Sequence, residues 1–172
     1  MKVSCLFACL IVLPATGGCT QPAGMYQKAQ VRVVDSRPCF AVADSEESRR
    51  TPPVVGAVSV DRFTGSDWEN VWAWITPLDP VVRLGPDQCV PFGTPLIAGG
   101  SNHVQALLQP GERYHVGINS QISNPSPVGD AMVGRMYGRD FCLGVDVGGE
   151  VAVVYVPTVA GERQWDVCEE SL

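Results

Sequence analysis

Apolar residues alternate with polar or small residues along most of the chain, and this period-two pattern constrains the fold more than any other feature. Val58 and Val60, and then Trp72 and Trp74, occupy every second position, as expected of strands that bury one face. Strand candidates recur about every 8–14 residues, with Gly and Pro turn residues between them. No long segment has the 3.6-residue period of an amphipathic helix. The pattern therefore predicts an all-β sandwich.

The pattern also predicts where strands and loops lie. A hairpin is expected at Gly148–Gly149, with the two-residue turn that a Gly pair favours. Two polar stretches, 44–53 and 119–135, are expected to be loops. The strand candidates are residues 31–33, 40–42, 54–63, 68–75, 88–92, 103–108, 114–118, 136–147 and 150–157.

The chain begins with a segment that is typical of secretion. One basic residue, Lys2, precedes an almost wholly apolar run from Val3 to Ala15, and small residues follow it. Such a run is a secretory signal, and it is shorter than the roughly 20 apolar residues that span a bilayer. We expect residues 1–18 to be a signal peptide and no later segment to form a transmembrane helix.

Small residues stand directly before Cys19, in the sequence Thr16–Gly17–Gly18. This arrangement resembles the lipobox of bacterial lipoproteins, which implies that Cys19 becomes the acylated first residue of the mature chain. Thr20, not Asp, follows it, and by resemblance to enterobacterial sorting this implies the outer membrane. We therefore expect a periplasmic protein that is lipid-anchored through Cys19. An ordinary signal peptide, with an unmodified Cys19, is the alternative.

After that cleavage, residues 19–28 would form a tether and residues 29–172 a single domain. The whole chain carries 12 Lys and Arg against 18 Asp and Glu, for a net charge of −6. Loss of residues 1–18 removes Lys2 and no acid, so the net charge becomes −7. Nucleic acid is not an expected partner, because phosphate contacts need clustered Lys and Arg.

Four of the seven cysteines remain for the folded domain once Cys5, Cys9 and Cys19 are set aside. An even number in an oxidising compartment predicts two disulfides. A zinc site is the alternative, but no Cys pair has C-x₂₋₄-C spacing and the chain has only two His. We expect no metal and no cofactor. The disulfide cysteines would be Cys39, Cys89, Cys142 and Cys168.

Three pairings of these cysteines are possible, and one of them is less favoured. If residues 141–147, 150–157 and 164–168 form a meander, Cys142 and Cys168 lie two strands apart, about 10 Å at roughly 4.8 Å per strand. A disulfide needs Cα atoms within about 7 Å. The expected partner of Cys39 is therefore Cys89, Cys168 or, across the sheets, Cys142.

A Pro-Gly turn precedes an alternating strand that begins near Tyr114. Leu108, Pro110, Gly111 and Tyr114 have the spacing L-x-P-G-x-x-Y. The spacing resembles the tyrosine corner of immunoglobulin-like and fibronectin-III-like sandwiches, in which the Tyr hydroxyl bonds to upstream backbone. The resemblance implies that Tyr114 has this structural role and that the sandwich is of that class.

The sequence marks no catalytic residue. It has no G-x-S-x-G elbow, no P-loop and no dinucleotide fingerprint. Ser101 and His103 are close in sequence, but on a turn they need not face each other. His115 alternates with core-type residues, which favours an exposed-face histidine over a metal ligand. We expect a protein that is not an enzyme, and a periplasmic hydrolase would require distant groups to converge.

A dense aromatic cluster comprises Phe63, Trp68, Trp72 and Trp74. Trp72 and Trp74 share one face of a strand, which favours a place in the core. Trp68 lies beside a Gly-Ser-Asp turn, and it is the better candidate for an exposed binding residue.

The layout of nearly the whole mature chain resembles putative type VI secretion immunity lipoproteins of Gram-negative bacteria. The features that carry the resemblance are Thr-Gly-Gly-Cys19, Pro38-Cys39-Phe40-Ala41-Val42, a Val-rich strand followed by a Trp-bearing strand, Gln88-Cys89-Val90-Pro91-Phe92-Gly93, Leu108-x-Pro110-Gly111-x-x-Tyr114-x-Val116 and Tyr137-x-x-x-Phe141-Cys142-Leu143.

The resemblance implies a non-enzymatic protector that is anchored in the periplasm and binds a secreted toxin. It supplies no catalytic residues. Residues 44–53 and 119–135 are the expected contact surfaces. The alternative is a structural or adhesion-type outer-membrane lipoprotein, whose loss would affect the envelope or attachment without any link to a toxin.

Overall fold

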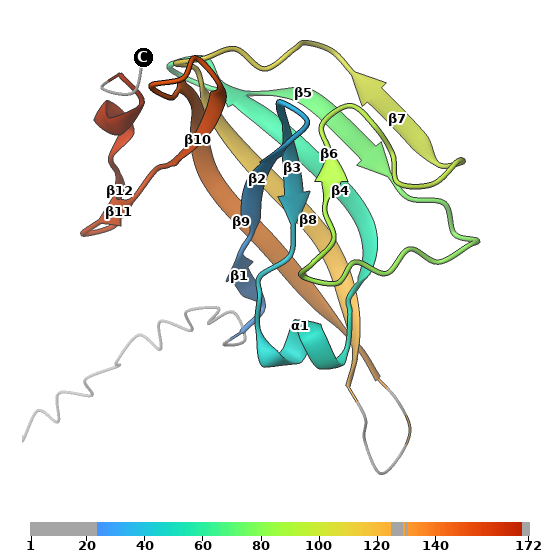
Figure 1. Cartoon of the computed structure of the whole chain (residues 1–172). Coiled ribbons are helices and arrows are strands. Elements are labelled where there is room, and N and C mark those ends of the chain that lie inside the picture. The colour runs from blue at the N-terminus through green and yellow to red at the C-terminus, as the bar shows by residue number, and fades with distance from the viewer. Residues whose placement is uncertain (1–23, 125–128, 130, 170–172) are drawn as a thin grey trace, which may run out of the picture.

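The computed structural model describes residues 24–124, 129 and 131–169, which form a mostly β structure (Figure 1). Sheets pack as a sandwich that carries two disulfides, so the all-β sandwich expected from the sequence is confirmed. The predicted signal peptide 1–18 and the predicted anchor Cys19 lie outside the described residues.

One large sheet forms the broad layer of the sandwich. Its strands pair antiparallel except for β1, which runs parallel to β9, and β10 pairs with β9 at the other end of the same edge. In spatial order the strands are β1 (Tyr26–Lys28), β9 (Ala131–Val145), β8 (Arg113–Asn124), β4 (Val54–Phe63), β5 (Trp68–Ile75) and β7 (Ser101–Val104), with β10 (Val151–Tyr155) beside β9.

A smaller sheet covers the inner face of the large one. It contains β2 (Gln30–Val34), β3 (Arg37–Ala41) and β6 (Val90–Pro91) in that order. The remaining elements are α1 (Glu46–Arg50), the hairpin of β11 (Thr158–Val159) and β12 (Glu162–Arg163), and the 3₁₀ helix η1 (Trp165–Cys168). Among the described residues, no helix has the length and apolar character needed to cross a membrane.

The core lies between the two sheets and is rich in aromatic residues. Phe40 of β3 stacks on Trp72 of β5, with ring centroids 5.8 Å apart, and also meets Phe141 of β9 at 5.9 Å. Trp72 and Trp74 are fully buried, as predicted, while Trp68 is 40% exposed. Val58 and Val60 are also fully buried, so the period-two pattern assigned the inner face correctly.

Several predicted boundaries were wrong. Residues 119–135 are not one long loop, because β8 continues to Asn124 and β9 begins at Ala131. Ile122 is buried, and Ser120 is buried with its hydroxyl donating to the Arg135 carbonyl at 3.0 Å, so packing extends the strand through polar residues. The expected two-residue hairpin is a five-residue loop, residues 146–150, since Val151 pairs with Val145.

Two smaller expectations also changed. Part of the expected tether 19–28 is structured, because Tyr26–Lys28 form β1 against β9. The expected loop 44–53 contains α1.

The disulfides join Cys39 to Cys89 and Cys142 to Cys168. The four cysteines therefore pair with one another as predicted, but the pairing of Cys142 with Cys168 was wrongly disfavoured. That argument required a third strand at the end of the meander. The chain instead leaves β10, turns back through β11 and β12 and ends in η1, which brings the two Cα atoms to 5.8 Å.

Tyr114 is fully buried at the start of β8, and its hydroxyl reaches the upstream backbone. The Gln109 N–H donates to this hydroxyl at 2.7 Å, and the hydroxyl lies 3.4 Å from the Gln109 carbonyl and 3.3 Å from a Glu112 carboxylate oxygen. Burial raises the pKa of Tyr114 to about 12, so the phenol stays neutral. The contact ties the Pro-Gly turn to the core.

Replacing Tyr114 by phenylalanine should lower the free energy of unfolding by about 1–3 kcal/mol, because the Gln109 N–H would lose its acceptor while the ring stays packed. Urea denaturation of both proteins measures the difference. Tyr137→Phe is the matched control, because Tyr137 is also buried but its hydroxyl has no hydrogen-bond partner among the described residues, and the substitution should not lower the value. Equal losses in the two variants would contradict a specific role for the Tyr114 hydroxyl.

Candidate functional site

Three aromatic rings gather on the outer face of the large sheet, and we call them the aromatic cluster: Phe63, Trp68 and Trp165. Phe63 and Trp68 are cross-strand partners on β4 and β5, with centroids 5.2 Å apart. Trp165 of η1 stacks on Phe63 at 6.3 Å and meets Trp68 at 6.1 Å. Two guanidinium groups lie over these rings, Arg113 over Trp165 at 5.8 Å and Arg163 over Trp68 at 5.7 Å.

The Cys142–Cys168 disulfide brings the C-terminal segment to this face. Cys142 lies on β9 directly opposite Arg113 of β8, and both sulfurs of the disulfide are buried. Arg113 also pairs with Glu169 at 3.1 Å. The bond therefore fixes η1, and with it Trp165, against the sheet.

A polar group adjoins the aromatic cluster. His115 and Asp140 are direct partners in the β8–β9 ladder, and His115 Nδ1 lies 2.7 Å from Asp140 Oδ1. Arg163 Nε donates to Asp140 Oδ2 at 2.5 Å. The imidazole packs over Gly138, where a Cβ would stand only 3.1 Å from its Cε1, and it meets the edge of Trp68 at 6.0 Å. Glycine at 138 thus leaves room for the ring.

The Asp140 carboxylate is held in its charged form. Burial alone would raise its pKa, but the hydrogen bonds from His115 and Arg163 outweigh burial, so the pKa lies below its ordinary value. A carboxyl with a depressed folded-state pKa stabilises the fold fully above its unfolded pKa, which is 3.8. That contribution is lost as the pH falls from this value through the folded pKa.

Asp140→Asn should therefore cost about 1–3 kcal/mol at neutral pH, because it removes the largely buried carboxylate that His115 and Arg163 contact, and it should cost less in acid. Urea unfolding at pH 7 and at about pH 2.5 measures both values. A difference between wild type and variant that stays constant over this range would contradict the assignment.

A cavity of about 360 Å³ opens beside His115 at the edge of β9. It lies where β1 and β10, the two neighbours of β9 on that edge, end. Its polar lining consists of Lys28, His115, Arg139, Asp140, Tyr155 and Thr158. The outer face thus combines partly exposed aromatic and cationic groups with a polar cavity.

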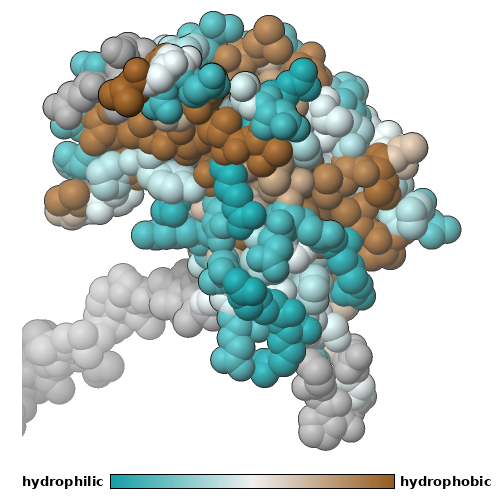
Figure 2. Space-filling view, in the orientation of Figure 1, coloured by the Kyte–Doolittle hydropathy of each residue, from teal (hydrophilic) through white to brown (hydrophobic). Residues whose placement is uncertain are grey.

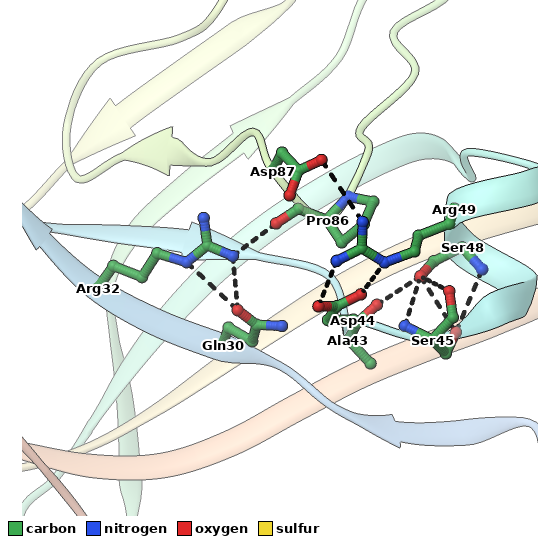
Figure 3. Close-up of polar contacts among 9 residues, drawn as sticks. All are labelled: Gln30, Arg32, Ala43, Asp44, Ser45, Ser48, Arg49, Pro86 and Asp87. Carbon is green, nitrogen blue, oxygen red and sulfur yellow. Dashed lines mark hydrogen bonds and ion pairs between the residues drawn. The ribbon is translucent and has the colours of Figure 1, made fainter.

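The expected contact segment 44–53 is built around α1 and is strongly polar (Figure 3). Ser45 and Ser48 form a capping box, and the Ser48 hydroxyl also donates to the Ala43 carbonyl at 2.6 Å. Arg49 donates twice to Asp44, at 2.5 and 2.6 Å, and its charge lies 3.9 Å from Asp87.

A second ion pair ties α1 to the large sheet. Arg135 of β9 donates twice to the Glu47 carboxylate, at 2.8 and 3.1 Å. These hydrogen bonds hold the pKa of Glu47 below its usual range. The capping box and these two ion pairs hold α1 in place, so its exposed face has a defined conformation.

The opposite end of the sandwich is apolar. Val33, Val34, Val145 and Val147 are exposed where the β2–β3 and β9–β10 hairpins turn. An apolar groove of about 440 Å³ lies between the layers there, lined by Phe92, Val104, Leu107, Leu108, Leu143 and Val151 among others. Figure 2 shows this contrast between a largely hydrophilic lower part over α1 and apolar surface in the upper part.

Ser101 and His103 are brought together. They lie on the same face of β7, and Ser101 Oγ is 2.6 Å from His103 Nε2. Both belong to a short edge strand rather than the expected turn. A serine nucleophile also needs an oriented base and an oxyanion hole. Neither Ser101 nor His103 lines the cavity beside His115.

No three His, Cys, Asp or Glu side chains are grouped to hold a metal ion within residues 24–124, 129 and 131–169. Comparisons of the chain with family models, curated proteins and solved structures found no match.

Sequence reasoning missed two parts of this site. It left His115 as an isolated exposed-face residue, and it assigned no role to Asp140 or to the segment with Arg163 and Trp165. The sequence did contain a signal for the contact between His115 and Asp140, because both residues occupy outward positions of strands that could pair. Nothing in the sequence indicated that the C-terminal segment folds over the large sheet.

Proposed function

We propose that this chain is a periplasmic immunity lipoprotein, which binds and neutralises a secreted antibacterial effector. The observation that carries the proposal is a group of two tryptophans and two arginines on a scaffold that a disulfide clamps. Trp68 and Arg163 are exposed, and Trp165 and Arg113 are half-buried beside them. Trp and Arg are the residues most enriched among those that dominate protein–protein binding energy. A rigid surface also loses little side-chain and backbone entropy when it binds.

The proposed location rests on the sequence of residues 1–19. A signal-like segment and a lipobox-like Cys19 support an anchor, and the outer membrane is the proposed site. The two disulfides fit an oxidising compartment. Cys19→Ser should move the protein from the membrane fraction to the soluble periplasmic fraction. Unchanged fractionation would refute lipidation at this residue.

The proposal is tested by co-expression. The proposal predicts that a secreted effector is encoded beside this chain, and that effector is directed to the periplasm with and without the full-length chain. Survival should depend on this chain, and equal killing in both cultures would refute immunity. The alternative, a structural or adhesion-type lipoprotein, is tested by deletion in the absence of any effector, and it predicts an envelope or attachment defect.

The contact surface is tested by two alanine substitutions of exposed apolar side chains. Trp68→Ala removes an exposed ring from the aromatic cluster, and Leu78→Ala removes an apolar side chain from a distant loop where Leu78 is 96% exposed. Trp68→Ala should weaken binding to the effector about 30-fold or more, as a hot-spot truncation of about 2 kcal/mol does. Isothermal titration calorimetry measures this. Protection that survives Trp68→Ala with unchanged affinity would place the contact elsewhere, with α1 and residues 44–53 as the next surface.

A further inference from the structure

The cavity beside His115 lies at a break in the pairing of β9. The Ala29 N–H donates to the Gly138 carbonyl at 3.1 Å, and the Val156 N–H donates to the Asp140 carbonyl at 3.1 Å. Between these two bonds the neighbouring chains part, and the cavity of about 360 Å³ opens at Gly138 to Asp140. The site is thus framed by paired backbone on both sides.

The charge around this cavity is positive, although the whole chain carries −6. Asp140 is the only carboxylate among the described residues that line the cavity, and both of its oxygens are already engaged, Oδ1 by His115 and Oδ2 by Arg163. Lys28 and Arg139 line the same cavity and have no ion pair with any residue that the structure describes. Two cations therefore remain without a counter-charge.

The Arg139 side chain is held in place without a hydrogen-bonding partner among the described residues. Its guanidinium lies 4.2 Å from the centroid of the Tyr155 ring, and its Nε is buried with no hydrogen bond to any residue that the structure describes. The Tyr155 hydroxyl donates to the Val31 carbonyl at 2.8 Å and accepts from the Val31 N–H at 3.1 Å, which fixes the ring. A partly buried guanidinium without an acceptor is unfavourable, and an anion would relieve this.

We propose that this cavity is an anion-binding site, which takes a carboxylate or a phosphate group between Arg139 and Lys28. Guanidinium groups bind both kinds of anion through paired hydrogen bonds, and a lysine adds a mobile point charge. The cation–π contact with Tyr155 sets the position of Arg139 before the ligand arrives. The site does not depend on the immunity function, because any ligand with an accessible anionic group fits this chemistry.

The experiment is a titration of the folded protein with sodium phosphate and, separately, with sodium acetate at low ionic strength, followed by ¹⁵N–¹H correlation spectra. We expect saturable shifts of the amides of Gly138, Asp140 and Val156, with a dissociation constant of about 1 mM. Tighter binding of phosphate would indicate a phosphorylated or nucleotide-like ligand, and tighter binding of acetate would indicate a carboxylate.

Arg139→Met and Lys28→Met should each weaken binding about tenfold or more, since a charge-assisted hydrogen bond is lost. Arg37→Met is the control, because Arg37 is exposed on β3 and does not line this cavity. Lys28 is also exposed, so its variant tests the site even if Arg139→Met fails to fold. Shifts that do not saturate, or that are equally reduced by Arg37→Met, would overturn the proposal.

Discussion

Replacing Trp72 by alanine should lower the free energy of unfolding by about 3–5 kcal/mol. Trp72 is fully buried, stacks on Phe40 at 5.8 Å and meets Phe92 at 5.4 Å. Its Nε1 also donates to Asn102 Oδ1 at 2.8 Å, which ties β5 to the edge strand β7. Truncation would therefore open a cavity at the centre of the sandwich and leave a polar partner without its donor. Since domains are typically stable by only about 5–15 kcal/mol, this loss is large.

The matched control is Trp68→Ala, four residues earlier on the same strand. Trp68 is 40% exposed on the outer face, so its loss removes far less buried area and should cost about 1 kcal/mol or less. Trp72→Phe keeps most of the packing and remains measurable if the alanine variant does not fold. Urea denaturation followed by circular dichroism gives all three values. Equal losses at positions 68 and 72 would contradict the assignment of inner and outer faces.

The alternation of apolar residues was sufficient to assign these faces because it depends only on neighbours along one strand. Trp72 and Trp74 were placed in the core correctly, and so were Val58 and Val60. The same logic underestimated β8, where Ser120 takes an inner position. Its hydroxyl is satisfied by a carbonyl of the next strand, and a single-sequence pattern does not show such a partner.

The candidate site could not be predicted because its residues meet only through the three-dimensional fold. His115 and Asp140 are 25 residues apart and become neighbours through the register of β8 and β9. Arg163 and Trp165 join them because the chain reverses direction after β10 and a disulfide holds the end of the chain. The meander predicted for this region failed at the same reversal, and the disulfide pairing was misjudged for that reason.

The two disulfides should contribute differently, although both close loops in the unfolded chain. Cys39–Cys89 spans 50 residues and Cys142–Cys168 spans 26. Loop-closure entropy then predicts losses of about 4 kcal/mol for Cys39→Ala with Cys89→Ala, and about 3.5 kcal/mol for Cys142→Ala with Cys168→Ala. Paired substitutions are needed, because a single one leaves a buried free thiol. Urea denaturation under oxidising conditions measures both losses.

The two disulfides should differ more in which part of the molecule their removal affects than in how much stability is lost. Cys39 lies in β3 of the small sheet and is buried, so loss of its disulfide should loosen the core. We expect this to lower the free energy of global, cooperative unfolding. Cys142–Cys168 holds η1 against the outer face, so its loss should first release Trp165 from Phe63 and Trp68. We expect proteolysis between residues 157 and 164 and a change in tryptophan fluorescence before global unfolding, and, under the proposed function, weaker binding to the effector. If the Cys142/Cys168 variant keeps wild-type fluorescence and resists protease in this segment, contacts other than the disulfide hold the C-terminal segment.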